Sequence, residues 1–344
     1  MALQISRHIY YKMLTLTPNK DNIVIAHMRT GKKAIPIYWH PVVNAELRNS
    51  VEDIGSFFTQ DFRDRFELSE DQSESIHTHM AQNQVCEKNQ SKFFKCKNAI
   101  QESLNTEMNI ADTESEFEIH FPPGSDTWGC LHLYVSASGG GKSFAVKQRL
   151  LQNLNGPKKD RRKFYWFSPE WNIDETVTEL KDKKYRDNVI GIDISDDSVE
   201  KSEHATPEDF FKNEVEMRIK HASPGSVIVA DDPMDASPGV AIPLRNLINR
   251  MQRVSRHKKI GLIFILHSIR SGIWSSQASN SCRFFSLFPR SQKGKIIEYL
   301  NRDLGMRLSE ARRAVKDFSA TSRCMTVRIH APQALIGRKL IRLL

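Results

Sequence analysis

A glycine-rich segment, Ser136-Ala-Ser-Gly-Gly-Gly-Lys-Ser143, contains the residue types that bind phosphate groups. Glycines let the chain turn so that several backbone N–H groups face one anion, and a helix that begins after the turn adds its positive dipole. In the pattern G-x-x-x-x-G-K-[S/T], the lysine contacts the β- and γ-phosphates of a nucleotide, and the following hydroxyl binds Mg²⁺. Ser136 stands where the pattern has its first glycine, and a surface turn without a ligand is the alternative interpretation. The residues expected to hold ATP, with Ser143 also on the metal, are Ser138, Gly139, Gly140, Gly141, Lys142 and Ser143.

Two adjacent carboxylates, Asp231 and Asp232, follow the apolar run Ser226-Val-Ile-Val-Ala230. Hydrolysis of a nucleotide requires an acid that binds Mg²⁺ and a group that orients the attacking water. Side chains after the carboxyl end of a buried parallel strand lie where open α/β sheets bind ligands. We therefore expect Asp231 to bind Mg²⁺ through water and Asp232 to be the base that activates water. The alternative is a structural pair that caps the turn Pro233-Met-Asp235.

Short apolar runs and helical patterns alternate around these residues. The runs predicted as strands are Leu131–Val135, Phe164–Phe167, Val189–Ile194, Val227–Ala230, Ile260–Leu266 and Phe284–Phe288. Helices are predicted at Phe144–Leu154, Pro207–His221, Leu244–Arg256, Lys293–Leu300 and Leu308–Phe318. Strands that are apolar throughout and alternate with helices predict an α/β fold, in which helices cover both faces of a mostly parallel sheet.

Residues 1–120 have a different pattern, and we expect a smaller α+β domain there, ahead of a domain at 121–344 that contains the glycine-rich segment. Ile23–His27 and Ala34–Trp39 predict a β-hairpin. Pro36 favours an edge position for its second strand, because proline cannot donate to a neighbouring strand. The pattern that follows, from residue 43 to residue 104, is mostly helical.

The spacing of the cysteines, the first residues of the chain and the length of the apolar runs limit the class of protein. Five cysteines, scattered and odd in number, are typical of reduced thiols in a cytosol-like compartment. His77, His79, Cys86 and Cys96 lack a close Cys pair, so unligated surface residues are expected rather than a zinc site. The first residues have no apolar core of signal-peptide length. The longest apolar run, Ile260–Leu266, is far shorter than the roughly 20 residues of a membrane span.

The order of motifs after residue 128 resembles that of the FtsK–HerA superfamily of ring-forming, DNA-pumping ATPases. The resemblance depends on a helix that ends in Arg256-His257 and on a buried strand, Ile260–Leu266, that is followed by the polar His267. The segment Arg283-Phe-Phe-Ser-Leu-Phe-Pro-Arg290 and two helical patterns come next. From about residue 128 to 330 the chain is most similar to the genome-packaging ATPases of double-stranded DNA viruses of the poxvirus, giant-virus, virophage and polinton type. Residues 1–120 lie outside the resemblance.

The resemblance implies a P-loop NTPase of the additional-strand, RecA-like type. It also implies that an arginine just before the fourth strand acts as a finger in the neighbouring subunit's site, and Arg256 matches that position. The superfamily usually has Gln after the next strand, where it senses the γ-phosphate; here the residue is His267. The catalytic residues expected are therefore Asp232, Arg256 and His267. A cation that stabilises a helix C-terminus and a structural histidine are the alternatives, and the rival fingers are Arg253, Arg270, Arg283 and Arg290.

The positive charge is concentrated in the last hundred residues. The whole chain has a net charge of +9, yet residues 245–344 contain 21 Lys and Arg against 4 Asp and Glu. Spread basic residues suit sequence-independent contacts with DNA phosphates, and ion pairing with an acidic face of a neighbouring subunit or of residues 1–120 is the alternative. The basic residues downstream of the predicted strands are Arg302, Arg307, Arg312, Arg313, Lys316, Arg323, Arg328, Arg338, Lys339 and Arg342.

The function predicted from these features is an ATP-driven double-stranded DNA translocase that packages a viral genome into a capsid, with ATP and Mg²⁺ as cofactors. Its implied partners are DNA held by its backbone, further copies of the chain in a ring, and capsid or portal-vertex proteins. The implied location is the host cytoplasm, a viral factory or the virion. A cellular or plasmid DNA pump, a P-loop kinase for a small substrate, and a silent nucleotide-binding scaffold are the alternatives.

Overall fold

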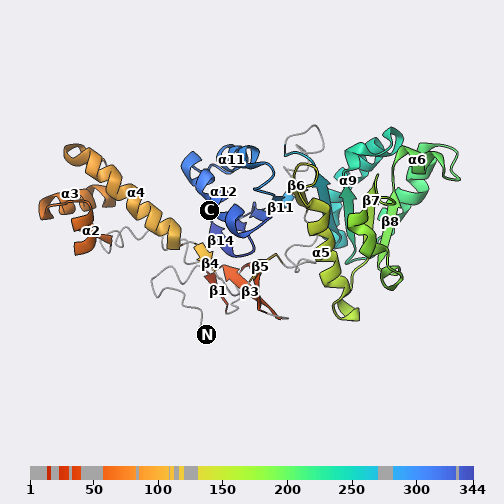
Figure 1. Cartoon of the computed structure of the whole chain (residues 1–344), viewed down its shortest axis with the longest axis horizontal. Helices are drawn as coiled ribbons and strands as arrows, with labels where there is room; N and C mark the ends of the chain where they lie inside the picture. The colour runs from red at the N-terminus through yellow and green to blue at the C-terminus, as the bar shows by residue number, and fades with distance from the viewer. Residues whose placement is uncertain are drawn as a thin grey trace. The chain divides into compact units, whose positions relative to one another are not determined.

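The chain divides into two units by its internal contacts: Met1–Ser115 with Ile341–Leu343, and Glu116–Leu340 with Leu344. The structure is a computed structural model, shown in Figure 1. It describes residues 14–16, 23–30, 33–39, 57–82, 85–107, 109–111, 116–119, 131–269, 282–330 and 333–344. The domain boundary expected between residues 120 and 121 lies outside the described residues.

A hairpin and a set of helices form the smaller unit. Strands β2 (Ile23–Thr30) and β3 (Lys33–Trp39) pair antiparallel, as predicted, with Thr30 opposite Lys33. The prediction that β3 is an edge strand is wrong at its end, because β1 (Leu14–Thr15) pairs with Tyr38 and Trp39. Pro36 lies before that paired segment, so its missing N–H removes no bond to β1.

Three helices of this unit enclose a small apolar cluster. They are α2 (Gln60–Arg65), α3 (Glu70–Ala81) and α4 (Gln90–Glu107), with a 3₁₀ turn at Glu87–Asn89 and the short β4 at Asn109–Ala111. A capping box between Ser69 and Gln72 fixes the start of α3. Ile76, Phe93, Cys86 and Cys96 are buried together, so the expectation that both cysteines lie on the surface is wrong.

The larger unit contains a mostly parallel sheet with the strand order β13-β12-β11-β6-β10-β9-β7-β8. The neighbours from β11 to β8 pair in parallel, whereas β12 is antiparallel to β11 and to β13. Strand β10 lies between β6, which precedes the glycine-rich loop, and β9, which ends at Asp231. This order confirms the predicted fold of a P-loop NTPase with an additional strand. The strands are β6 (Leu131–Val135), β7 (Phe164–Ser168), β8 (Val189–Asp193), β9 (Val227–Asp231), β10 (Gly261–Leu266), β11 (Cys282–Leu287), β12 (Met325–Arg328) and β13 (Ala334–Ile336).

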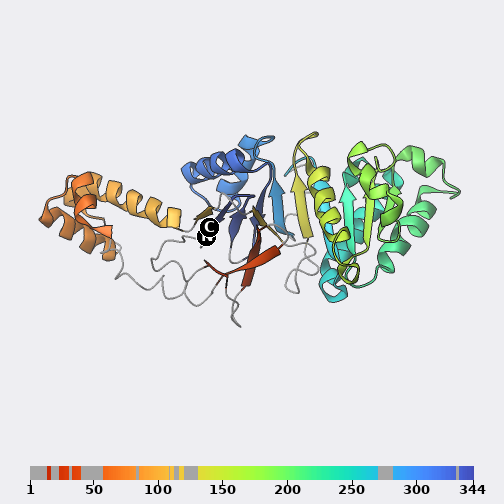
Figure 2. The ribbon, with the colours of Figure 1, turned by 60° about the horizontal axis from the view of Figure 1, so that its bottom comes forward.

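Helices lie on both sides of this sheet (Figure 2), and two buried clusters of side chains pack against its two faces. Alternate residues of β10 belong to different clusters: Phe264 packs with residues of α9, whereas Ile263 packs with residues of α5. Because successive side chains of a strand point to opposite faces, a strand buried on both faces must be apolar throughout. The continuous apolar runs in the sequence have this cause.

The main helices occur where the sequence predicts them, with shifted ends. Helix α9 begins six residues before the predicted start and contains Pro243 in its second turn. The segment predicted as one helix at Pro207–His221 contains six π-helical residues, Phe211–Glu216. None of the described helices is long and apolar enough to cross a membrane. The bounds are α5 (Lys142–Leu154), α6 (Asp196–Glu200), α7 (Pro207–Phe210), α8 (Met217–Lys220), α9 (Pro238–Lys258), α11 (Lys293–Arg302) and α12 (Leu308–Thr321).

We predict that Ile263→Ala lowers the free energy of unfolding by about 2–5 kcal/mol, because it leaves a cavity under α5. Ile263 is 1% exposed, whereas Ile173 is 77% exposed and offers a matched control. Ile173→Ala should change the unfolding free energy by less than about 0.5 kcal/mol. Urea unfolding followed by circular dichroism measures both, and equal losses would contradict a core that lies on this face of the sheet.

Candidate functional site

The glycine-rich loop connects β6 to α5 and has the backbone geometry of a phosphate cradle. Gly139 and Gly141 have φ values of +70° and +93°, which favour glycine, and Gly141 is the N-cap of α5. A Cβ on Gly140 would overlap the side chain of Ser136. Three successive glycines are therefore required by backbone conformation or by space, and the N-terminus of α5 points its free N–H groups at the loop.

Ser136, the departure from the phosphate-loop pattern, is fully buried and has a partner. Its hydroxyl donates to the hydroxyl of Ser291 at 2.9 Å, and its backbone N–H donates to the carbonyl of Leu266 at 3.2 Å. A polar side chain buried without a partner would cost free energy, and this bond removes that cost. The serine thus ties the start of the loop to the turn that follows β11.

The parallel register brings the other predicted residues to the same edge of the sheet. Val135 is opposite Leu266, and Ile265 is opposite Asp231, so β6, β10 and β9 end level with one another. The next residues along each strand are the loop, His267 and Asp232. Five of the predicted side chains therefore meet at the carboxyl edge of three neighbouring strands, where open α/β sheets bind ligands.

A chain of polar contacts links Lys142, His267 and Asp232. The Lys142 ammonium donates to Nδ1 of His267 at 3.2 Å, and Nε2 of His267 lies 3.0 Å from Oδ2 of Asp232. Because a lysine ammonium can only donate, Nδ1 must accept, and the ring proton is on Nε2, where it donates to Asp232. The Lys142 side chain is only 5% exposed. His267 is therefore the hydrogen-bond partner of this buried cation, and it links the cation to the Asp232 carboxylate.

Ser143 and Asp231 form the second contact of the site. The Ser143 hydroxyl donates to Oδ1 of Asp231 at 3.3 Å. Burial, reinforced by the neighbouring Asp232 carboxylate, raises the pKa of Asp231 to about 8. The bond from Ser143 and the charge of Lys142 act in the opposite direction. A carboxyl group with so little solvent is a poor anion unless a cation binds to it.

Asp232 has an unusual backbone and an oxygen without a partner. Its φ of +43° lies in the left-handed region, and its N–H donates to the carbonyl of Ile265 at 3.0 Å. Oδ1 is buried and has no hydrogen-bond partner among the described residues. Burial raises the pKa of Asp232, while the charges of Lys142 and His267 lower it. A strained, under-satisfied carboxylate beside a lysine and a histidine is typical of a functional site.

These groups fit a nucleoside triphosphate with Mg²⁺. The hydroxyl of Ser143 and the carboxyl of Asp231 are hard oxygen ligands, the kind that Mg²⁺ takes in partial sets alongside water and phosphate. The orphaned Oδ1 of Asp232 lies in the same cluster as the Lys142 ammonium. The backbone N–H groups of the loop and Lys142 would hold the phosphates. No group of three or more His, Cys, Asp or Glu in the described part of the chain could hold a metal ion by itself.

The predicted finger, Arg256, lies in the last turn of α9, and its side chain is outside the described residues. Of the rivals, Arg253 is exposed on the same helix, Arg270 is outside the described residues, and Arg283 lies within β11. Arg290 donates its Nε–H to the carbonyl of Ser319 at 3.0 Å. The described residues therefore do not test the role of Arg256, which stays a prediction.

Two polar residues of the site were not predicted, and both follow the carboxyl ends of parallel strands. Gln292, after β11, donates from Nε2 to the carbonyl of His267 at 2.9 Å, and its Oε1 is buried without a partner among the described residues. Glu170, after β7, lies close enough for its charge to raise the pKa of Asp232. The rule that found Asp231 and Asp232 applies equally to these positions and could have found them.

Comparisons with known proteins give distant likenesses only. No protein-family model matches the chain, and no curated protein matches it. Among solved structures, the genome-packaging NTPase B204 of Sulfolobus turreted icosahedral virus 2 with ATPγS is 14% identical, with a TM-score of 0.37 over 62% of this chain and 98% of that one. The TcpA coupling protein of pCW3 conjugation is 12% identical, with a TM-score of 0.39 over 67% of this chain and 65% of that one. A KaiC-like protein of Pyrococcus horikoshii is 12% identical, with a TM-score of 0.31 over 47% and 73% of the two chains. These values are too low to support an assignment, and the fold is defined by strand order and register.

We predict that Asp231→Asn removes a pH-dependent loss of stability in the metal-free protein. Burial holds the pKa of Asp231 at about 8, above its ordinary value, so ionisation favours the unfolded chain. The native protein should therefore lose stability as pH rises from about 4 to about 8. Asparagine cannot ionise, so the melting temperature of the variant should exceed that of the wild type increasingly across this range, measured with EDTA present.

The exposed Asp187 offers the matched control. Asp187→Asn should change the melting temperature by the same small amount at every pH. A wild-type-like pH profile for Asp231→Asn would show that the carboxyl is not held protonated at this edge of the sheet.

Proposed function

We propose that the chain is an ATPase that moves double-stranded DNA. The observation that supports hydrolysis is the convergence of Lys142, Ser143, Asp231, Asp232 and His267 at the carboxyl ends of β6, β9 and β10. The glycine-rich loop binds phosphates, and the two carboxyl groups supply a metal ligand and a base. Neither a structural turn nor a strand-end cap requires all five groups to meet.

Each residue of the cluster has a separate part in the proposed reaction. Lys142 exchanges its bond to His267 for the phosphates, and Ser143 and Asp231 hold Mg²⁺. When bound, Mg²⁺ neutralises charge on the phosphate oxygens. Asp232 accepts a proton from the attacking water through Oδ1, the atom that has no other partner among the described residues. His267, held by Asp232 and by Gln292 at its carbonyl, keeps the base oriented.

Exposed basic residues of the C-terminal part support the choice of DNA as the partner. Arg307, Arg312 and Lys316 are exposed on or beside α12. Arg302 and Arg313 are also exposed, although Glu298 and Asp317 on their own helices partly neutralise them. Arg328 is buried, so its inclusion among the DNA-contacting residues is wrong. Contacts of this kind bind the phosphate backbone without selecting a sequence, as a translocase requires.

Packaging of a viral genome is the finer form of this proposal. It depends on the resemblance of residues 128–330 to viral packaging ATPases, as do a ring of subunits and partners at the capsid or portal vertex. A pump for cellular or plasmid DNA would have the same site. A kinase for a small substrate would differ, because DNA would not change its turnover.

The decisive prediction is ATP hydrolysis that long double-stranded DNA stimulates several-fold. Lys142→Ala should lower kcat/KM for ATP at least about a hundredfold, because the loop loses its only cation beside the phosphates. A phosphate-release assay with and without DNA measures both effects. Lys147→Ala, five residues further along α5, is the matched control and should hydrolyse ATP like the wild type. Turnover that persists in Lys142→Ala would contradict the site, and turnover indifferent to DNA would contradict translocation.

A mixing experiment tests Arg256 as a finger that acts across a subunit interface. Arg256→Ala and Lys142→Ala chains should each be inactive alone. Mixed before assembly, they should regain part of the activity, since some interfaces then join an intact loop to an intact arginine. Asp232→Ala mixed with Lys142→Ala is the control and should stay inactive, because both residues belong to the same subunit's half of the site and no interface in the mixture is intact. No recovery in the first mixture would place the finger elsewhere.

A further inference from the structure

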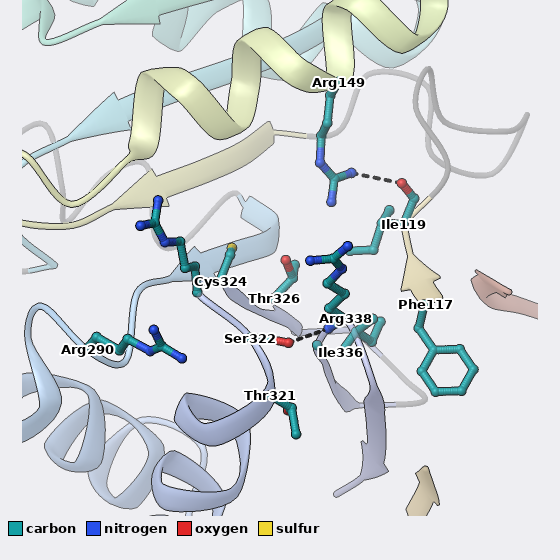
Figure 3. Close-up of a pocket in the computed structure, with 12 residues that line it drawn as sticks. Phe117, Ile119, Arg149, Arg290, Thr321, Ser322, Cys324, Thr326, Ile336 and Arg338 are labelled. Atoms are coloured by element: carbon teal, nitrogen blue, oxygen red, sulfur yellow. Dashed lines mark hydrogen bonds between the residues drawn. The ribbon is translucent and has the colours of Figure 1, made fainter. Parts of the chain in front are cut away.

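A pocket of about 420 Å³ in the larger unit lies outside the nucleotide site (Figure 3). Its walls come from α5, from β5 (Glu116–Glu118) and the residue after it, from the turn after β11, from the end of α12 with the start of β12, and from the end of β13 with the turn after it. None of the glycine-rich loop residues, Asp231, Asp232 or His267 lines it. A volume of this size is typical of sites that bind small organic molecules.

Arginines from different segments dominate the polar lining. They are Arg149, Arg290, Arg323 and Arg338, and the described lining contains no acidic side chain. In Figure 3, Arg149 extends from α5 and Arg338 from the opposite wall, and their guanidinium groups point toward one another. Like charges that face each other across a cavity repel, so the arrangement favours an anion between them.

Most of this positive charge has no counter-ion within the described chain. Arg338 pairs with Glu116. Arg149 is half-buried, and among the described residues its guanidinium donates to the carbonyl of Ile119, at 2.8 Å. Arg290 donates to the carbonyl of Ser319, and no described carboxylate pairs with Arg323. A half-buried cation beside a carbonyl but no carboxylate costs free energy that an anionic ligand would recover.

The positive charge of Arg149 acts on Cys324, which also lines the pocket. Burial raises the pKa of the Cys324 thiol, and the charge of Arg149 opposes that shift. On the other side of the pocket, Phe117, Ile119 and Ile336 form an apolar wall. A ligand that fits both parts has an anionic group for the guanidinium forks and a less polar remainder for the wall.

We propose that this pocket is a second phosphate-binding site, which takes the phosphate group of an ester rather than a carboxylate. The guanidinium groups of Arg149 and Arg338 face one another from different walls, and a tetrahedral phosphate, with acceptor oxygens on several sides, can accept from both of them more readily than a flat carboxylate can. Two sources have this chemistry: a free phosphorylated molecule such as a nucleotide, and the backbone of DNA. The second source rests on the proposed function.

The pocket adjoins the nucleotide site through one turn. Arg290 lines the pocket, and the next residue, Ser291, accepts the hydrogen bond from Ser136 at the start of the glycine-rich loop. Phosphate in the pocket would therefore act on a turn that contacts the loop. This adjacency gives an occupied pocket a direct route to ATP turnover.

The test uses the full chain with Lys142→Ala, so that the glycine-rich loop contributes little to anion binding. The pocket variant adds Arg149→Gln and Arg323→Gln; the matched control adds Lys201→Gln and Lys212→Gln, which remove the same charge from exposed sites elsewhere. Inorganic phosphate is titrated against chloride at equal ionic strength, with the melting temperature as readout. The pocket variant should weaken phosphate binding about tenfold or more, as two charge-assisted contacts are lost, while the control binds like its parent.

A second arm measures the affinity of a short DNA duplex by fluorescence anisotropy over a range of salt. Loss of both phosphate and duplex affinity, with the salt slope reduced by about two, supports the site and identifies DNA as the source. Loss of phosphate affinity alone supports the site and identifies a free phosphorylated molecule. Phosphate and duplex affinities equal to those of the control would overturn the proposal.

Two further measurements separate folding and function from the pocket itself. Arg323→Gln alone changes an exposed side chain, so it should fold like the parent and still weaken phosphate binding. ATP hydrolysis by the chain with Lys142, Arg149 and Arg323 all intact is the second measurement, and it tests the proposed function rather than the pocket. A chain that binds phosphate in the pocket but neither hydrolyses ATP nor binds DNA would refute the proposed function and leave the pocket assigned.

Discussion

Ionisable groups buried at one edge of a parallel sheet are the constraint on which the site depends. Lys142 and Asp231 are 5% and 4% exposed, and burial of a charged or polar group is costly unless a partner compensates it. The structure meets this cost with the contacts from Lys142 through His267 to Asp232 and from Ser143 to Asp231. Each contact joins residues far apart in the sequence, and each is available only because β6, β10 and β9 end level with one another.

Strand β10 is central to this arrangement because it lies between the strand of the loop and the strand of the carboxylates. It places His267 within reach of both Lys142 and Asp232. The turn after β11 adds a second layer of contacts: Ser291 accepts from Ser136, and Gln292 donates to the carbonyl of His267. This turn leads directly into α11. A shift of the loop or of His267 would therefore move the turn and the start of the basic C-terminal helices.

Much of the sheet could be predicted from the sequence because strands buried on both faces are apolar throughout, and the glycine-rich loop follows such a strand. The site residues on the loop, β9 and β10 follow from the same rule. What could not be predicted depends on contacts between distant segments. The start of α9 at Pro238 is hidden by Pro243, since proline usually ends a helix prediction. Cys86 and Cys96 become buried only when α3 and α4 pack together. The arginine pocket likewise forms only when segments distant in the sequence, from Phe117 to Arg338, come together.

A crystal structure of the chain with Mg²⁺ and a non-hydrolysable ATP analogue tests the central claim most directly. The account predicts that Nζ of Lys142 leaves Nδ1 of His267 for the phosphate oxygens, and that the oxygens of Ser143 and Asp231 turn from each other to the metal. The analogue bound elsewhere, with the contacts from Lys142 to His267 and from Ser143 to Asp231 unchanged, would contradict it.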